Sequence, residues 1–206
     1  PRARGRWPQR CGEIADVLLR YGEDRQSRRI AAAIVRVREE SPLLTTADLA
    51  RLIDGIVRRK PGASHPATRS FQAVRMHINR ELDALEQGLA QSMDVLADGG
   101  RLAVITFHSL EDRIVKRFLA ERSQIARGSR HMPEVKAEPP TFRLTTRHPA
   151  SASDAETAAN PRARSARLRG AERTDAPARD INPAALGVPT LPEYSSAPHS
   201  KTGKAQ

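Results

Sequence analysis

The apolar positions in the middle of the chain predict a long amphipathic helix followed by a buried strand. From Phe71 to Leu96 apolar residues recur at spacings of three and four, which is the period of an α-helix with one buried face. Asp98, Gly99 and Gly100 then supply residues that tolerate a tight turn. The continuous apolar run 102–107 that follows is typical of a parallel strand buried on both faces. We expect one helix of about 27 residues leading into this strand.

Three shorter helices are predicted before this region. Apolar residues at helical spacing over 13–22 and 23–40 indicate two helices that meet at Gly22. Thr45, with Asp48 three residues later, has the spacing of a capping box and predicts the start of a third helix.

The remainder of the chain predicts one further helix, two strands and an unstructured end. Ser109 and Asp112 also have capping-box spacing, so a helix should begin directly after the buried strand. Residues 142–146 and 166–171 alternate with period two, which predicts a final antiparallel pair beside that strand. Beyond Thr174 the sequence is polar and proline-rich, and we expect disorder.

Charge favours a polyanionic partner. The chain has 35 basic and 24 acidic residues and a formal net charge of +11, as proteins that bind nucleic acid often have. Arginine is strongly preferred over lysine, a bias that a GC-rich genome would also produce. The single cysteine, Cys11, excludes an intrachain disulfide and a cysteine-rich metal site, and no metal site is predicted. No apolar run approaches the roughly 20 residues that cross a bilayer, so a cytoplasmic protein without a membrane segment is expected.

The polar corner after the buried strand is the predicted functional site, because open α/β sheets bind ligands beyond the carboxyl ends of their strands. A helix cap accounts for Ser109 and Asp112, which are interpreted as support for the corner. It does not account for His108 and Glu111, which are the candidate catalytic residues on the substrate side. Phe107 is either a core residue, the favoured interpretation, or a stacking partner for a base.

Several basic and amide side chains are candidates for RNA contact. The three consecutive cations at 58–60 could bind phosphate, although a solvated helix end explains this run equally well. A polar stripe on the long helix could bind bases and phosphates, or could simply be solvated surface. The candidates are Arg58, Arg59, Lys60, Arg69, Gln72, Arg75, Asn79, Arg162 and Arg164.

Four segments, in this order along the chain, resemble the bacterial 16S ribosomal RNA cytosine-N4 methyltransferase family, also described as MraW-like or as small subunit methyltransferase H. They are residues 21–25, 65–75, 99–113 and 160–164. The resemblance implies transfer of a methyl group from S-adenosylmethionine to N4 of cytosine 1402 in the decoding region of 16S rRNA. It implies a partner, the small ribosomal subunit, and says nothing of oligomeric state.

The fold class that this resemblance implies is α/β, the C-terminal half of a Rossmann-like S-adenosylmethionine-dependent methyltransferase sheet preceded by part of a helical insertion domain. Residues 1–12 would be an atypical basic start, 13–66 part of the RNA-recognition insertion, 67–174 the C-terminal part of the methyltransferase domain, and 175–206 a disordered tail. The strands at 102, 142 and 166 would be the fifth, sixth and seventh of the sheet.

The sequence contains no glycine-rich turn of the donor-binding type and no acidic residue at ribose-binding spacing after one. We therefore expect no cofactor-binding residues in this chain, no measurable binding of S-adenosylmethionine by the chain alone, and a truncated form of the enzyme. The alternatives are a non-catalytic RNA-binding module and a non-functional fragment.

Overall fold

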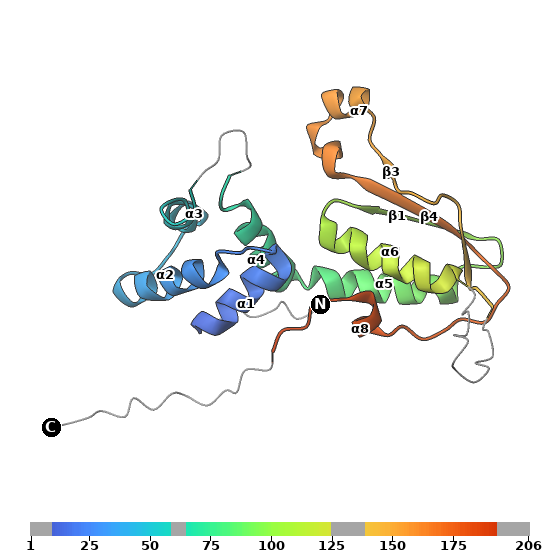
Figure 1. The fold of residues 1–206 in the computed structure, drawn as a ribbon, viewed down its shortest axis with the longest axis horizontal. Helices are drawn as coiled ribbons and strands as arrows, with labels where there is room; N and C mark the ends of the chain where they lie inside the picture. The colour runs from blue at the N-terminus through green and yellow to red at the C-terminus, as the bar shows by residue number, and fades with distance from the viewer. Residues whose placement is uncertain (1–9, 59–64, 125–138, 193–206) are drawn as a thin grey trace, which may run out of the picture. The chain divides into compact units, whose positions relative to one another are not determined.

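The computed structural model describes residues 10–58, 65–124 and 139–192. The chain divides into two compact units, Pro1–Asn79 with Thr190–Gln206, and Arg80–Pro189. Both are shown in Figure 1.

The first unit is helical and has its own apolar core. Its helices are α1 (Cys11–Gly22), α2 (Ser27–Glu40), α3 (Thr46–Asp54) and α4 (Thr68–Asn79). The three helices predicted ahead of the long helix are confirmed, and Thr45 and Asp48 form the expected capping box of α3. The core contains the apolar stripes of all four helices, with Ile14, Leu18, Ile30, Ile53 and Ala73 among its buried members.

Helices α1 and α4 approach each other closely at Gly22. A Cβ atom at this position would lie 2.7 Å from the carbonyl oxygen of Arg69, a separation that real Cβ atoms do not show. Glycine is therefore needed here for packing. The left-handed backbone that ends α1 falls on the next residue, Glu23, with φ of 49°.

The predicted single helix over 71–96 is wrong, because the structure interrupts it at Arg80. Arg80 adopts a left-handed backbone, φ 53° and ψ 45°, which separates α4 from α5 (Glu81–Val95). Its guanidinium pairs with Asp83 at 2.6 Å in the first turn of α5. The apolar spacing continues across the break, so the periodicity of the sequence alone does not reveal where the helix is interrupted.

The second unit contains a small sheet in which every pairing is antiparallel. Its strands are β1 (Arg101–Thr106), β2 (Phe142–Leu144), β3 (Ala150–Ser151) and β4 (Arg167–Arg173). The order is β1-β4-β2, with β3 also paired to β4. The predicted final antiparallel pair is confirmed, and its second strand lies between the other two. Helix α6 (Ser109–Ser123) packs against β1, β2 and β4, and α5 packs against α6 (Figure 1).

Strand β1 is not buried on both faces, contrary to the prediction. Its residues alternate between exposed and partly buried positions, and Ile105 is 60% exposed. Among the described residues β1 pairs only with β4, in the antiparallel sense. The described helices cover only one face of this strand. A continuous apolar run is therefore not buried on both faces in this chain.

Strand β4 turns basic side chains toward the helices. Arg173 is 7% exposed, whereas Leu168 is 40% exposed on the alternate face. The buried guanidinium of Arg173 donates from Nε to the carbonyl oxygen of Met93 and from Nη1 to that of Thr141, so hydrogen bonds within the protein compensate for its burial.

The predicted disorder beyond Thr174 is wrong for the residues up to 192. Helix α8 (Pro183–Leu186) packs on α6, and the side chain of Leu186 is fully buried. Arg122 Nη2 donates to the carbonyl of Asp180 at 2.9 Å, and Arg117 Nη1 donates to that of Leu186 at 3.3 Å. Arginines of α6 thus bind the backbone of this segment, which a composition-based prediction does not consider. Residues 193–206, the rest of the predicted tail, lie outside the described residues.

The connection between β2 and β4 is partly helical. It contains β3, the short helix α7 (Asp154–Ala159) and the 3-10 helix η1 (Pro161–Ser165). None of the described helices is long and apolar enough to cross a membrane.

Candidate functional site

The corner between β1 and α6 is capped by His108. The backbone of His108 is extended, and its Nδ1 accepts a hydrogen bond from the backbone N–H of Glu111 at 3.3 Å. Ser109 is the first residue of the helix, so its predicted position as the capping residue is wrong. An imidazole nitrogen that carries no proton can accept from a free helix N–H as a serine oxygen does.

The Glu111 carboxylate contacts both the backbone and the His108 side chain at this corner. Oε2 accepts from the backbone N–H of Phe107 at 3.0 Å, and Oε1 lies 3.1 Å from Nε2 of His108. Burial raises the pKa of Glu111, but the contacts from the His108 side chain and from the Phe107 backbone N–H outweigh it. The net pKa lies below its usual value of 4.5, so Glu111 is ionised at neutral pH.

Asp112 joins the first turn of α6 to the sheet. Its two carboxylate oxygens accept hydrogen bonds from Nε and Nη2 of Arg169 on β4, at 2.8 and 3.0 Å. This bidentate pair is largely buried, with 24% of the Asp112 side chain and 13% of the Arg169 side chain exposed. Asp112 therefore links the start of α6 to β4.

Glu81 is a member of this site that the sequence interpretation missed. It is the first residue of α5, and one of its carboxylate oxygens, a ring nitrogen of His108 and a carboxylate oxygen of Glu111 lie within 4.8 Å of one another. The prediction of one uninterrupted helix across this position gives Glu81 no role. The break at Arg80 makes it an N-terminal helix residue next to the end of β1.

Phe107 lies at the surface of this corner. It is 56% exposed, so the favoured interpretation as a core residue is wrong. An exposed aromatic ring is suited to stacking on a nucleobase.

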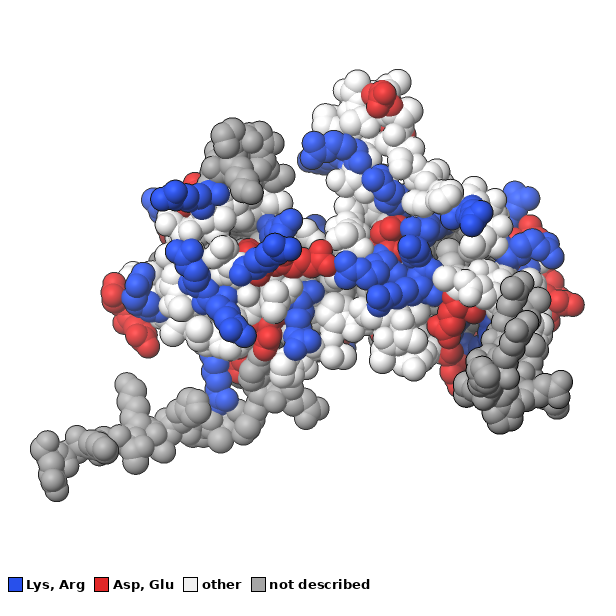
Figure 2. Space-filling model, viewed as in Figure 1, with Lys and Arg blue, Asp and Glu red and all other residues white. Residues whose placement is uncertain are grey.

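The RNA-contact candidates that the structure describes lie mostly on the surface. Arg58, Arg69, Arg75 and Asn79 are exposed in the first unit, and Gln72 is half-buried with its amide against the sulfur of Met76. Arg162 and Arg164 are exposed on η1 in the second unit. On the face shown in Figure 2, basic side chains are spread over both units among acidic ones. Arg59 and Lys60 lie outside the described residues.

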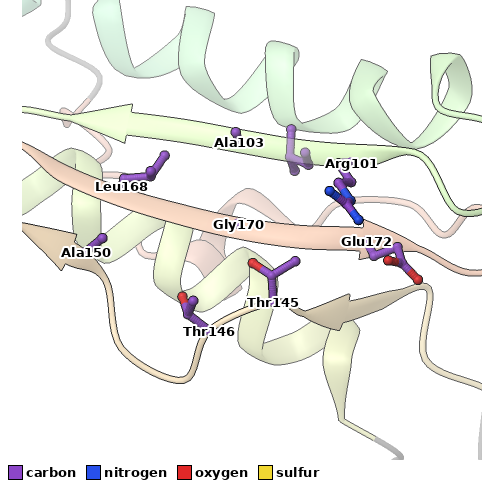
Figure 3. A pocket seen from close by; sticks show the side chains of 9 residues that line it. Arg101, Ala103, Thr145, Thr146, Ala150, Leu168, Gly170 and Glu172 are labelled. Carbon is purple, nitrogen blue, oxygen red and sulfur yellow. The ribbon is translucent and has the colours of Figure 1, made fainter.

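A cavity of about 420 Å³ lies on the sheet, away from this corner. Arg101 and Glu172 line it at the end where β1 begins, and Gly170 forms part of its floor (Figure 3). A Cβ at Gly170 would lie 2.5 Å from Oγ1 of Thr145, so glycine lets the segment after β2 pass over the strand. Glu172 pairs with Arg143 at 3.2 Å.

The helical unit and the small antiparallel sheet with its helices are compatible with part of a methyltransferase fold. The family model of the MraW methylase family matches residues 7–174, and the chain belongs to this family. The chain is 53% identical to "Ribosomal RNA small subunit methyltransferase H" of Rhodopseudomonas palustris (strain TIE-1), over 89% of this chain and 54% of the relative. It is 57% identical to the protein of the same name from Bradyrhizobium diazoefficiens, over 81% of this chain and 50% of the relative. The chain thus spans about half the length of the curated relatives that it matches.

Proposed function

We propose that this chain forms the substrate side of an enzyme that transfers a methyl group from S-adenosylmethionine to N4 of cytosine 1402 in 16S rRNA. The observation that carries the proposal is the match, over most of the chain, to relatives named ribosomal RNA small subunit methyltransferase H. The reaction would take place in the cytoplasm on the small ribosomal subunit.

The corner at the end of β1 supports this reaction chemically. The exocyclic amine of cytosine is a weak nucleophile, because its lone pair is delocalised into the ring. An enzyme must therefore fix its orientation and accept hydrogen bonds from its N–H groups. Glu111 supplies an ionised acceptor, and the exposed ring of Phe107 supplies a stacking surface for the base.

The residues that the structure describes do not fit the methyl donor. The cavity lies over the face of the sheet, between Arg101 at the start of β1 and Leu168 on β4, whereas donor sites in open α/β sheets lie beyond the carboxyl ends of strands. Its one acidic lining residue, Glu172, pairs with Arg143, and no glycine-rich turn opens a helix beside it. We assign donor binding to the part of the relatives' length that this chain does not match.

The basic residues would hold the RNA. Arginines on the first unit and on η1 contact phosphates in this proposal, which fixes the RNA without reading its sequence. Binding should weaken with salt, and log K should fall with log salt at a slope near −0.7 per neutralised phosphate on single strands.

A chimera tests the proposal. The matched region of the Rhodopseudomonas palustris relative is replaced by residues 7–174 of this chain, and small subunits lacking the modification are incubated with S-adenosylmethionine. Mass spectrometry of 16S rRNA fragments should find one methyl group on N4 of cytosine 1402, and the chain alone should add none. A folded chimera that leaves this nucleotide unmodified overturns the proposal. If the chain alone still binds RNA with a normal salt slope, the non-catalytic RNA-binding module is the correct alternative.

A further inference from the structure

The cluster of Glu81, His108 and Glu111 brings two carboxylates and one imidazole together at the carboxyl end of β1. One ligand atom of each lies within 4.8 Å of the other two. The side chains of His108 and Glu111 are 10% and 23% exposed, so the cluster is largely shielded yet still reachable. This composition fits two occupants, a divalent cation or a group that donates hydrogen bonds.

The protonation of His108 decides against the cation. Its Nδ1 accepts from the backbone N–H of Glu111, so the proton of the neutral ring sits on Nε2. Nε2 is the nitrogen that lies beside the Glu111 carboxylate, and a protonated nitrogen has no lone pair to give to a metal. A histidine that binds a metal through one ring nitrogen usually donates a hydrogen bond from the N–H of the other. In this site the other nitrogen is Nδ1, which accepts from the backbone N–H of Glu111.

The Nε2–H of His108 is available to orient the carboxylates. Nε2 lies 3.1 Å from Oε1 of Glu111, an ion-pair distance, yet it has no partner in hydrogen-bond geometry among the described residues. The atom is shielded from water and lies beside the Glu111 carboxylate, within a cluster that also contains Glu81. A carboxylate offers about four acceptor positions, so Glu111, which already accepts from Phe107, retains capacity for a further donor.

Glu81 is held in place by the break between α4 and α5. The left-handed backbone of Arg80 begins the helix, and the pairing of Arg80 with Asp83 fixes the first turn. A carboxylate in the first turn of a helix is stabilised by the positive end of the helix dipole. The carboxylate of Glu81 can only accept hydrogen bonds.

We propose that Glu81 and Glu111 together accept the two N–H groups of the target cytosine amine, with His108 as the residue that positions both carboxylates. This inference rests on the proposed function and adds Glu81 to its site. The ring of Phe107, whose backbone N–H donates to Glu111, is exposed and can stack on the base. Uracil presents a carbonyl oxygen in place of the amine and would face two negative charges, so the pair selects cytosine over uracil.

Binding of two single-stranded oligonucleotides tests this assignment. One is a run of uridines with a single central cytidine, and the other contains uridine only, so the phosphate contacts are the same in both. The wild-type chain should bind the cytidine oligonucleotide about tenfold more tightly in low salt, as expected for hydrogen bonds between a base and charged groups. Glu81→Gln should abolish this preference, because an amide can rotate to face either base.

Glu86→Gln is the matched control, since it removes the same charge from the same helix outside the cluster. It should keep the preference, and thermal melting should show both variants folded. If Glu81→Gln also prefers the cytidine oligonucleotide, or if the wild type binds both oligonucleotides equally well, the role of Glu81 is overturned. Methyl transfer by the chimera tests the proposed function separately. Saturable binding of Mn²⁺ by the wild type that is lost in Glu81→Gln would also overturn it, in favour of a metal site. A chain that binds neither oligonucleotide overturns both this inference and the proposed RNA contacts.

Discussion

Asp112 and Arg169 form two parallel hydrogen bonds, of 2.8 and 3.0 Å, between the first turn of α6 and the middle of β4. In the sheet register Arg169 lies opposite Val104, two residues before the end of β1. The pair therefore fixes the start of α6 relative to both strands. The corner that carries His108 and Glu111 is held by the sheet as well as by its own cap.

A double-mutant cycle should measure this link. We expect Asp112→Ala and Arg169→Ala to be coupled by about 1–3 kcal/mol in the free energy of unfolding, because the pair is bidentate and largely shielded from water. The control is Arg143 and Glu172, a single contact at 3.2 Å with the arginine side chain 76% exposed, which should couple by less than about 1 kcal/mol. Equal coupling in the two cycles, measured by urea denaturation, would contradict the structural role assigned to Asp112.

The segment after β4 should contribute to the stability of the second unit. Leu186 is fully buried, so Leu186→Ala should lower the free energy of unfolding by about 2–5 kcal/mol through lost burial and the cavity left behind. Val95→Ala is the control, since Val95 is 78% exposed and its truncation should change little. Equal melting temperatures for Leu186→Ala and the wild type would show that this segment does not dock.

Local patterns in the sequence predict most of the helices and the antiparallel pair, because apolar spacing and caps act over a few residues. The spacing over 142–146 and 166–171 indicates strands whatever they pack against. The break at Arg80 cannot be predicted in this way, because a single residue with a left-handed backbone leaves the apolar spacing unchanged. The docking of Leu186 cannot be predicted in this way either, because this docking depends on arginines of α6 that are far away in the sequence.

The position of the candidate site follows from the rule that ligands bind at strand ends, but the partners of its residues do not. The spacing of Ser109 and Asp112 indicates a cap, whereas the structure gives the cap to His108 and joins Asp112 to Arg169. A histidine cap has no distinct sequence signal. Glu81 joins the cluster only through the packing of α5 beside α6, which no local pattern encodes.

Stability should depend on pH through Glu111. Its pKa is lower in the folded chain than in the unfolded chain, so its ionised form contributes stability that is fully present above the ordinary glutamate pKa of 4.5. This contribution is lost as the pH falls through the lower folded pKa. Glu111→Gln should therefore be less stable than the wild type at pH 7, and urea denaturation should show the difference shrinking below about pH 4.5.

Glu86 gives the opposite sign and serves as the control. Burial and then the charge of Asp83 raise the pKa of Glu86, so its ionised form is disfavoured in the folded chain. Glu86→Gln should be slightly more stable than the wild type at neutral pH, and the gain should vanish in acid. A constant difference between Glu111→Gln and the wild type from pH 7 to pH 3 would show that the corner does not hold Glu111 ionised.

Replacement of His108 by asparagine should separate its role as a cap from its role in the site. Asparagine is a strong capping residue whose side-chain oxygen can accept from the Glu111 N–H as Nδ1 does, but it has no atom equivalent to Nε2. His108→Asn should keep a melting temperature near that of the wild type, whereas His108→Ala should lose about 0.5–2 kcal/mol of stability with the cap. In the chimera, both variants should reduce methyl transfer to 16S rRNA, with no rescue by asparagine, because neither orients Glu81 and Glu111. If His108→Asn restores wild-type methyl transfer together with stability, His108 is a cap alone.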